Sequence, residues 1–416
     1  MNLLNETTRT ETAVLERTGA HLGASRARLA GVLGGLVEDR SQGTRLWTTD
    51  GREFLNVGGY GVFLLGARHP RVVAAVEEQL GRHPLGTRAL LEPAAAEAAE
   101  ALAERAPGGL SKIYFAGAGT EAVEAAVKMA ATLGRHRLVG ARDGYHGKTL
   151  GSLPLTANPT YQAPFRPLLR AAEHVPYGDI AALEATVADD TCVVLEPVQG
   201  EGGVNVPPPG YLKQVERLCR ERGALLVIDE IMTGLGRTGS WWACERDGVV
   251  PDILLAGKSL GGGLLPVSAA IATEEAFAAL DADLCLHTST FSAAPLGMAA
   301  ARATLQVIEE EGLVERAAVI GARLRATLDD IRRRECPGLL VDVRGAGLLI
   351  GLEFADPGLA GGFLLELIDA GVIANHSLNA GPVVRLTPPA VLGSADEAWL
   401  VEAFERACVA LRSLNG

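Results

Sequence analysis

The sequence predicts an α/β protein with a large, mostly parallel sheet covered by helices and a smaller α+β lobe. Short runs that are entirely apolar alternate with segments whose apolar residues recur at helical spacing. Strands buried on both faces form continuous apolar runs of this kind, which is typical of parallel sheets. The 416 residues are 48% hydrophobic, which suits one large unit with a smaller lobe, or two to three domains.

The first part of the chain predicts a mixed N-terminal region. Residues 1 to about 45 are expected to be helical and mobile. Leu46–Val57 is typical of a β-hairpin whose turn is Asp50-Gly51. Helices are expected next over Arg71–Leu80 and Pro93–Arg105, and proline suits the first turn of the second helix.

The middle of the chain carries the α/β alternation. Strands are expected at Lys112–Ala116, Cys192–Glu196, Ala224–Ile228 and Asp252–Ala256. Helices are expected at Thr120–Ala130, after a glycine break at 117–119, and at Tyr211–Arg222, which Gly223 would end. From about Leu313, helices mix with short strands such as Gly347–Phe354 and Val383–Leu386, which predicts the smaller α+β lobe.

Composition excludes several classes of protein. The net charge of −12 argues against a protein whose main partner is nucleic acid, because such affinity comes from Lys and Arg. No stretch approaches the roughly 20 uninterrupted apolar residues of a membrane span, and the first residues lack the apolar core of a signal peptide. A cytoplasmic location is therefore expected. No CxxC pair suggests a metal site among Cys192, Cys219, Cys244, Cys285, Cys336 and Cys408.

Three of the expected strands end in residues that can perform chemistry. Glu196, Asp229 and Lys258 follow successive strands, and ligands of parallel sheets bind at the carboxyl ends of the strands. Opposite charges at one edge suggest a cationic ring held by a carboxylate and an aldehyde held by a lysine. The glycine-rich turn at 117–119 would direct backbone N–H groups and a helix N-terminus at a phosphate. Each feature alone is also common in purely structural or solvated positions.

With these residues, the sequence resembles the class III (ornithine/ω-amino acid type) pyridoxal-phosphate aminotransferases of fold type I. The resemblance runs from about Leu46 to Ala407. It rests on FAGAGTEAVEAAVKMA, GYHGKT, LEPVQGEGGV, LLVIDEIMTGLGRTG, PDILLAGKSLGGG, TSTFSAAPLGMAAA and VVRLTPP. The resemblance implies three units: an N-terminal segment (1–68) that packs with the small domain, a large cofactor-binding domain (69–310) and a small domain (311–416).

The resemblance assigns cofactor roles to matching residues. Lys258 matches the lysine that forms a Schiff base with pyridoxal 5′-phosphate and then moves the proton. Asp229 matches the carboxylate that pairs with the pyridine nitrogen. Tyr145 matches the aromatic residue stacked on the ring, and His146 beside it either supports that site or is structural. The remaining cofactor matches are Gly119 and Thr120 in the phosphate cup, Glu196 and Gln199 beside the ring, and Thr290, which would reach the neighbouring subunit's cofactor in a homodimer.

The sequence departs from the family pattern at two cofactor motifs. The usual Asn-Ser-Gly before the phosphate-binding helix is replaced by Gly117-Ala118-Gly119. The serine hydroxyl is thus absent, and phosphate binding would depend more on backbone donors. The usual Gly-Asn-Pro after Thr290 is replaced by Ala293-Ala294-Pro295.

The substrate residues follow from the same resemblance. Arg385 matches the arginine that holds an α-carboxylate, a geometry to which a guanidinium is suited. Glu201 matches the glutamate that pairs with this arginine when the substrate has no carboxylate there. Tyr60 lies in the expected substrate-binding stretch 58–63, which matches no branch of the family clearly. Alternatively, Arg385 forms a surface salt bridge and Glu201 is an ordinary loop acid.

The leading hypothesis is therefore a ping-pong transaminase with small-molecule substrates. An amine donor, glutamate or an ω-amine, would pass nitrogen to a keto acid, aldehyde or ketone. Local segments look most like the diamine (putrescine-type) branch. A biosynthetic tailoring role on a larger metabolite or a modified peptide is also compatible. The alternatives are a mutase, racemase or decarboxylase of the same fold, and a non-catalytic cofactor-binding protein.

Overall fold

The structure, a computed structural model, describes residues 11–415. Its largest sheet is built from β4 (Lys112–Ala116), β5 (Arg137–Ala141), β6 (Ala172–Val175), β7 (Thr191–Leu195), β8 (Leu225–Asp229), β9 (Ile253–Ala256) and β10 (Ser268–Ala272). The strand order is β4-β10-β9-β8-β7-β5-β6. Strands β6, β5, β7, β8 and β9 run parallel, and β10 is antiparallel to both β9 and β4. The predicted fold class, a mostly parallel sheet, is confirmed.

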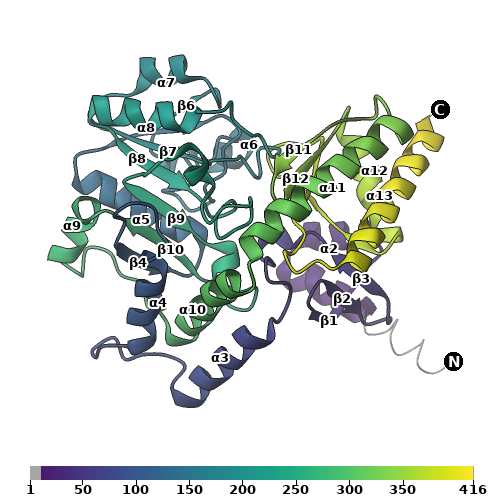
Figure 1. Cartoon of the computed structure of the whole chain (residues 1–416), viewed down its shortest axis with the longest axis horizontal. Helices are drawn as coiled ribbons and strands as arrows, with labels where there is room; N and C mark the ends of the chain where they lie inside the picture. The colour runs from purple at the N-terminus through teal and green to yellow at the C-terminus, as the bar shows by residue number, and fades with distance from the viewer. Residues whose placement is uncertain (1–10, 416) are drawn as a thin grey trace.

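Helices cover both faces of this sheet (Figure 1). Successive strand residues point to opposite faces, so Cys192 and Val194 pack in a different apolar cluster from Val193 and Leu195. One face lies against α5 (Gly119–Thr132) and α9 (Glu274–Ala282). The other lies against α8 (Tyr211–Arg222) and α10 (Pro295–Glu310). Because strands β7, β8 and β9 are buried along their whole length, their polar groups concentrate at the strand ends.

The C-terminal part forms a second, antiparallel sheet. It consists of β11 (Leu340–Ala346), β12 (Leu349–Phe354), β14 (Asn375–His376) and β15 (Val383–Leu386), in the order β11-β12-β15-β14. It is accompanied by α11 (Leu313–Glu335), α12 (Pro357–Asp369) and α13 (Ser394–Asn415). The strand predicted at Gly347–Phe354 begins two residues later, at Leu349. Gly347 instead lies in the turn between β11 and β12, with a φ of 51°.

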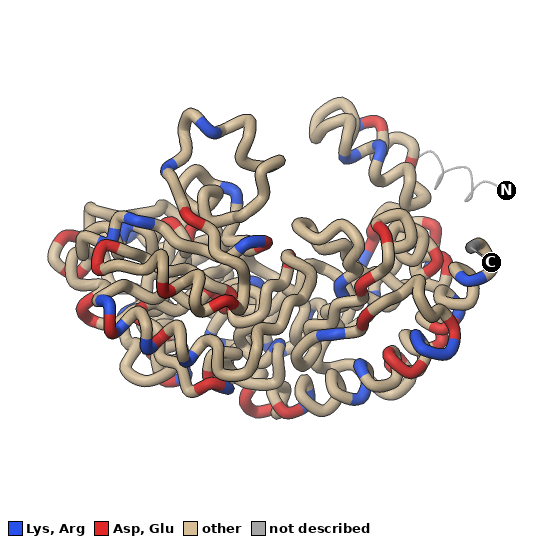
Figure 2. Tube along the Cα trace, turned by 90° about the horizontal axis from the view of Figure 1, so that it is seen from above, with Lys and Arg blue, Asp and Glu red and all other residues tan. Residues whose placement is uncertain are grey.

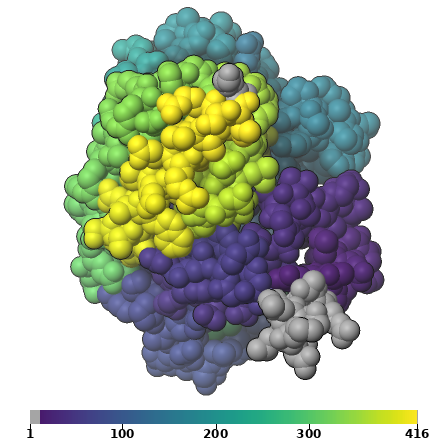
Figure 3. Space-filling view, turned by 90° about the vertical axis from the view of Figure 1, so that its right-hand side faces the viewer, coloured from purple at the N-terminus to yellow at the C-terminus, as the bar shows by residue number. Residues whose placement is uncertain are grey.

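The third sheet joins strands of the N-terminal region to one strand of the C-terminal part of the chain. It consists of β1 (Glu38–Gln42), β2 (Arg45–Thr48), β3 (Glu53–Asn56) and β13 (Val372–Ile373), and β13 pairs with β3 in parallel. In Figure 3 the C-terminal residues lie directly against this N-terminal region. We propose on this basis that residues 1–68 pack with a small domain at 311–416, after a large domain at 69–310.

The N-terminal prediction needs one correction. The predicted hairpin is confirmed, with Gly51 in its turn at a φ of 85°. The helical prediction agrees with η1 (Thr18–Leu22) and α2 (Ala24–Val32), and its first ten residues lie outside the described part. It is wrong at β1, where a polar segment takes strand form because it pairs with the edge of β2.

The remaining helices fill the connections. They are α3 (Pro70–Arg82), α4 (Pro93–Ala103), α6 (Pro159–Gln162), α7 (Ile180–Thr186), and the 3-10 helices η2 (Gly59–Gly61), η3 (Ala163–Leu168), η4 (Ala243–Asp247) and η5 (Lys258–Gly261). Charges of both signs are interspersed along the trace in Figure 2. Among residues 11–415, no helix combines the length and the apolar character that crossing a membrane requires.

Candidate active site

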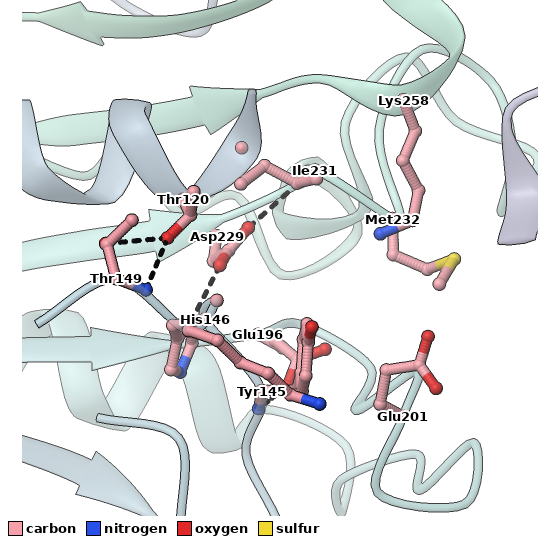
Figure 4. A pocket seen from close by; sticks show the side chains of 13 residues that line it. Thr120, Tyr145, His146, Thr149, Glu196, Glu201, Asp229, Ile231, Met232 and Lys258 are labelled. Carbon is pink, nitrogen blue, oxygen red and sulfur yellow. Dashed lines mark hydrogen bonds and ion pairs between the residues drawn. The ribbon is translucent and has the colours of Figure 1, made fainter. Parts of the chain in front are cut away.

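Three side chains from the ends of neighbouring parallel strands line one cavity of about 470 Å³. Glu196 follows β7, Asp229 ends β8, and Lys258 follows β9 after one glycine. Figure 4 shows them with their neighbours. The full lining is Gly119, Thr120, Tyr145, His146, Gly147, Lys148, Thr149, Glu196, Glu201, Asp229, Ile231, Met232 and Lys258.

Asp229 forms a buried ion pair with His146. The imidazole Nδ1 lies 2.7 Å from Asp229 Oδ2, and both side chains are almost completely buried. The other carboxylate oxygen, Oδ1, accepts a hydrogen bond from the backbone N–H of Ile231 at 3.0 Å. Burial disfavours the imidazolium, but the hydrogen bond and charge of Asp229 outweigh burial and raise the pKa of His146. His146 thus holds the orientation of the Asp229 carboxylate.

Glu196 lies beside this pair. Its Oε1 accepts a hydrogen bond from Tyr145 N at 2.9 Å, and its Oε2 accepts one from Gly200 N at 3.0 Å. Burial raises the pKa of Glu196 to about 7, and the negative charge of Asp229 acts in the same direction. The carboxyl group therefore fixes the backbone that carries Tyr145.

Lys258 extends into the cavity from a strained backbone position. Its φ is 41°, a left-handed value that is uncommon for residues other than glycine and that recurs at functional sites. Burial lowers the pKa of the Lys258 ammonium group, and the charge of Arg385 adds to this effect, while Glu201 opposes it. Within the described residues, Nζ makes no hydrogen bond. Such an amine gives up its proton more readily than an exposed lysine.

The N-terminus of α5 borders the same cavity. Gly119 opens this 14-residue helix, and a Cβ there would lie 2.8 Å from Ile231 Cδ1, so a larger residue would require the Ile231 side chain to shift. Thr120 Oγ1 lies 2.8 Å from Thr149 Oγ1 and 2.7 Å from Ser152 Oγ. The helix end and three hydroxyl groups together form an anion-binding corner. Sequence reasoning assigned no role to Thr149, although GYHGKT contains it, or to Ser152.

Arg385 and Glu201 form the second buried ion pair. Arg385 Nη1 lies 2.8 Å from Glu201 Oε2, and their side chains are 0% and 5% exposed. Nη1 also donates to Gly200 O at 3.2 Å, whereas Nε and Nη2 have no partner within the described residues. Burial alone would raise the pKa of Glu201, but the charge and hydrogen bond of Arg385 lower it. Glu201 lines the cavity and covers Arg385, which does not.

Besides Arg385, three expected residues do not line this cavity in the described part of the chain. Gln199 was expected beside the cofactor ring, but its amide points elsewhere: Nε2 donates to Arg142 O at 2.6 Å, and Oε1 accepts from Asn205 Nδ2 at 3.0 Å. Thr290 is exposed and borders a different cavity. Tyr60 is 53% exposed, next to Gly61, where a Cβ would lie 3.7 Å from Lys258 Cδ.

Two further residues near the cavity were not predicted from sequence. Arg237, in the quoted GLGRTG segment, is fully buried, and its guanidinium donates to Pro388 O at 2.6 Å and to Gly61 O at 3.3 Å. Burial, with a contribution from the charge of Arg385, lowers the pKa of Arg237 to about 9. Lys148 lines the cavity, and its Nζ lies 3.6 Å from the centre of the Tyr161 ring. In the sequence, Arg237 and Lys148 are marked only by the segments that contain them, GLGRTG and GYHGKT.

Comparison with known proteins identifies the family. Residues 30–408 match the family described as aminotransferase class-III. The chain belongs to the class III aminotransferases. Among similar solved structures is an ornithine aminotransferase from Toxoplasma gondii, 31% identical, with a TM-score of 0.86 and 91% of both chains covered. An ω-transaminase from Pseudomonas jessenii in complex with PMP is 27% identical, with a TM-score of 0.85 over 93% of this chain and 95% of that one.

A third similar structure is an (S)-enantioselective ω-transaminase from Thermomicrobium roseum. It is 27% identical, with a TM-score of 0.85 over 90% of this chain and 93% of that one. The fold is therefore that of the fold type I transferases, and this class III aminotransferase depends on pyridoxal 5′-phosphate. The cavity fits such a cofactor chemically: it offers a helix N-terminus with hydroxyl groups, the buried carboxylate of Asp229 and the half-buried amine of Lys258, which makes no hydrogen bond within the described residues.

Proposed function

We propose that this aminotransferase works by a ping-pong mechanism and accepts two kinds of amine in one pocket. Glutamate would serve in one half-reaction, and an ω-amine such as a diamine in the other. The observation that carries this proposal is the buried Arg385–Glu201 pair at the cavity wall. A guanidinium covered by a carboxylate side chain can exchange this partner for a substrate carboxylate, or it can remain in the ion pair.

The cofactor would be held by the groups gathered at the strand ends. Lys258 is assigned to the aldehyde, Asp229 to the pyridine nitrogen and Tyr145 to the ring face. The phosphate is assigned to the N-terminus of α5 and to Thr120, whose contacts with Thr149 and Ser152 supply hydroxyl groups where the family's serine is missing. When bound, pyridoxal phosphate supplies an aldehyde that accepts the amino group and a ring that withdraws electrons from the reacting carbon.

Proton movement is assigned to Lys258. Its lowered pKa raises the fraction of neutral amine, and a neutral amine can take a proton from carbon and return it. His146 and the N–H of Ile231 hold the two oxygens of Asp229, and so fix the carboxylate that would receive the pyridine nitrogen. Glu196 fixes Tyr145 through a backbone hydrogen bond. These contacts orient the reactive groups before any substrate arrives.

Substrate choice is assigned to Glu201. With a carboxylate substrate, Glu201 would leave Arg385. Nε and Nη2 of Arg385, which have no partner among residues 11–415, would then be free for a bidentate contact. With an amine that lacks this carboxylate, Glu201 stays and avoids leaving a buried cation unpaired. One pocket thus serves two substrates without two sites.

The test is single-turnover kinetics of two variants, followed by the cofactor's absorbance. Arg385→Ala should weaken the reaction with glutamate by a factor worth about 2–5 kcal/mol, and affect a simple diamine much less. Glu201→Ala should show the opposite bias, because unpaired Arg385 favours carboxylates. If both variants slow both donors by the same factor, the exchange does not occur. The same assay addresses the mutase, racemase and decarboxylase alternatives and the non-catalytic alternative: half-transamination by glutamate supports the transaminase.

The acceptor is assigned to the carbonyl class: a keto acid, an aldehyde or a ketone. We extend this class to a larger metabolite, such as a modified peptide in a biosynthetic role; the exposed side chain of Tyr60, in the expected substrate-binding stretch, is available to contact such a substrate. A panel of small and peptide-borne carbonyl acceptors, offered to the amine-loaded enzyme, tests this extension.

We also propose that the active unit is a homodimer. Thr290 borders a second cavity, of about 720 Å³, with the exposed side chains of Leu90, Leu91 and Phe291. Apolar groups this exposed favour burial against a second copy, which would bring Thr290 to the neighbouring active site. A cytoplasmic location is part of the proposal, since all six cysteines, which lie in the described part, are unpaired.

A further inference from the structure

The loop between β14 and β15 crosses from the C-terminal lobe to the wall of the active site. Its backbone makes two hydrogen bonds to a single residue of that wall. Asn379 N donates to Glu201 O at 2.9 Å, and Leu378 N donates to Glu201 Oε2 at 3.0 Å. The strand that follows this loop carries Arg385. The loop therefore contacts Glu201 and is continuous with the strand that carries Arg385.

The side chain of Asn379 fastens this loop to a second part of the wall. Its Nδ2 donates to Asp143 O at 3.2 Å and to Gly144 O at 3.1 Å. Its Oδ1 accepts a hydrogen bond from Asn158 Nδ2 at 3.1 Å. Asp143 and Gly144 immediately precede Tyr145. The Asn379 side chain thus connects the β14–β15 loop, which is hydrogen-bonded to Glu201, with the segment that carries Tyr145.

These contacts converge on one oxygen atom. Glu201 Oε2 accepts from both Arg385 Nη1, at 2.8 Å, and Leu378 N, at 3.0 Å. When Glu201 leaves Arg385, it gives up both bonds. An N–H group that is already fixed in place stabilises the paired state more than one on a loose loop, because less chain entropy is lost. The anchoring of the loop by Asn379 therefore favours the paired state.

We propose that Asn379 is a positioning residue that stabilises the Glu201–Arg385 pair and biases the enzyme toward amines that lack a carboxylate. This inference rests on the proposed function. Asn379 acts through Glu201 and touches no reacting atom. Weakening its hydrogen bonds should make Glu201 easier to displace, and should shift selectivity toward carboxylate donors.

The informative variant is Asn379→Asp. It keeps the acceptor for Asn158 but replaces the amide donor with an oxygen that faces two carbonyl groups. The ratio of kcat/KM for glutamate to that for a diamine should rise about twofold to tenfold, the equivalent of roughly one net hydrogen bond. In a Glu201→Ala background, the same substitution should leave the ratio unchanged. Ser377→Ala is the matched control on this loop, because Ser377 Oγ has no partner within the described residues.

A second measurement uses the cofactor-free protein. Hydrogen exchange at the amides of Leu378 and Asn379 should be faster in Asn379→Asp than in the wild type, and unchanged in Ser377→Ala. One outcome refutes the positioning role of Asn379 and leaves the proposed function standing. In that outcome, Arg385→Ala and Glu201→Ala show their opposite biases, while Asn379→Asp changes neither the kcat/KM ratio nor the rate of hydrogen exchange. If neither Arg385→Ala nor Glu201→Ala shifts selectivity, the proposed function fails, and the role of Asn379 fails with it.

Discussion

The buried Arg385–Glu201 pair leads to a stability prediction that needs no cofactor. Arg385 is fully buried in the wild type, and Glu201→Ala leaves its guanidinium with Gly200 O as its remaining acceptor and with the charge of Arg237 nearby. Removing one partner of such a pair typically costs about 3–5 kcal/mol, because a charge stays buried without compensation. Replacing both partners, in Glu201→Ala/Arg385→Met, removes the charge as well. The double variant should therefore be more stable than Glu201→Ala alone.

Urea unfolding of the cofactor-free protein at pH 7.5 measures these free energies. Glu353→Ala is the matched control, because it breaks a half-exposed ion pair with Arg344, whose loss should cost at most about 1 kcal/mol. The pKa of Glu201 is lowered in the folded state, so the contribution of the pair is complete above the ordinary value of 4.5 and declines as the pH falls through the lowered pKa. The reasoning is refuted if Glu201→Ala costs no more than Glu353→Ala, or if the double variant loses the sum of the single losses.

Two further predictions concern the strand-end residues. Lys258→Ala should remain folded, since it truncates a half-buried side chain whose amine makes no hydrogen bond within the described residues, but it should lose covalent attachment of pyridoxal phosphate. Mass spectrometry after borohydride reduction should locate the adduct on Lys258 in the wild type, and an adduct on another lysine would contradict the assignment. For Glu196, the pKa of about 7 means that the folded state keeps a proton that the unfolded chain releases near 4.5. The free energy of unfolding should therefore decrease as the pH rises from 4.5 to 7, by up to about 3 kcal/mol more in the wild type than in Glu196→Gln. If denaturant titrations give the same pH dependence of this free energy for both proteins, the burial argument is contradicted.

Local signals in the sequence explain which elements could be predicted. The bounds of α8 agree with the prediction because Gly223 ends the helix in a left-handed conformation with a φ of 69°. Strands β7, β8 and β9 were recognisable because they are apolar along their length. Strand β1, with the sequence EDRSQ, was missed because its form depends on pairing with a distant edge rather than on any local pattern.

The candidate site divides in the same way. The strand-end argument alone indicated that Glu196, Asp229 and Lys258 would lie together. The direction of the Gln199 side chain depends on a tight turn in which Gln199 pairs with Asn205, and residue identity does not encode it. Asn379 was missed because the partners of its side chain are more than two hundred residues earlier in the chain.

The parallel pairing of β3 with β13 also constrains the order in which the protein can fold during synthesis. Leu55 pairs with Val372, so roughly 300 residues must leave the ribosome before the edge of β3 finds its neighbour. At about 5–20 residues per second, this takes roughly 15–60 s. Strands β1, β2 and β3 lack their fourth neighbour until then, and Leu55 is completely buried in the finished protein. The first strands to be made are therefore completed late in synthesis, and the edge of β3 stays unpaired by β13 during that interval.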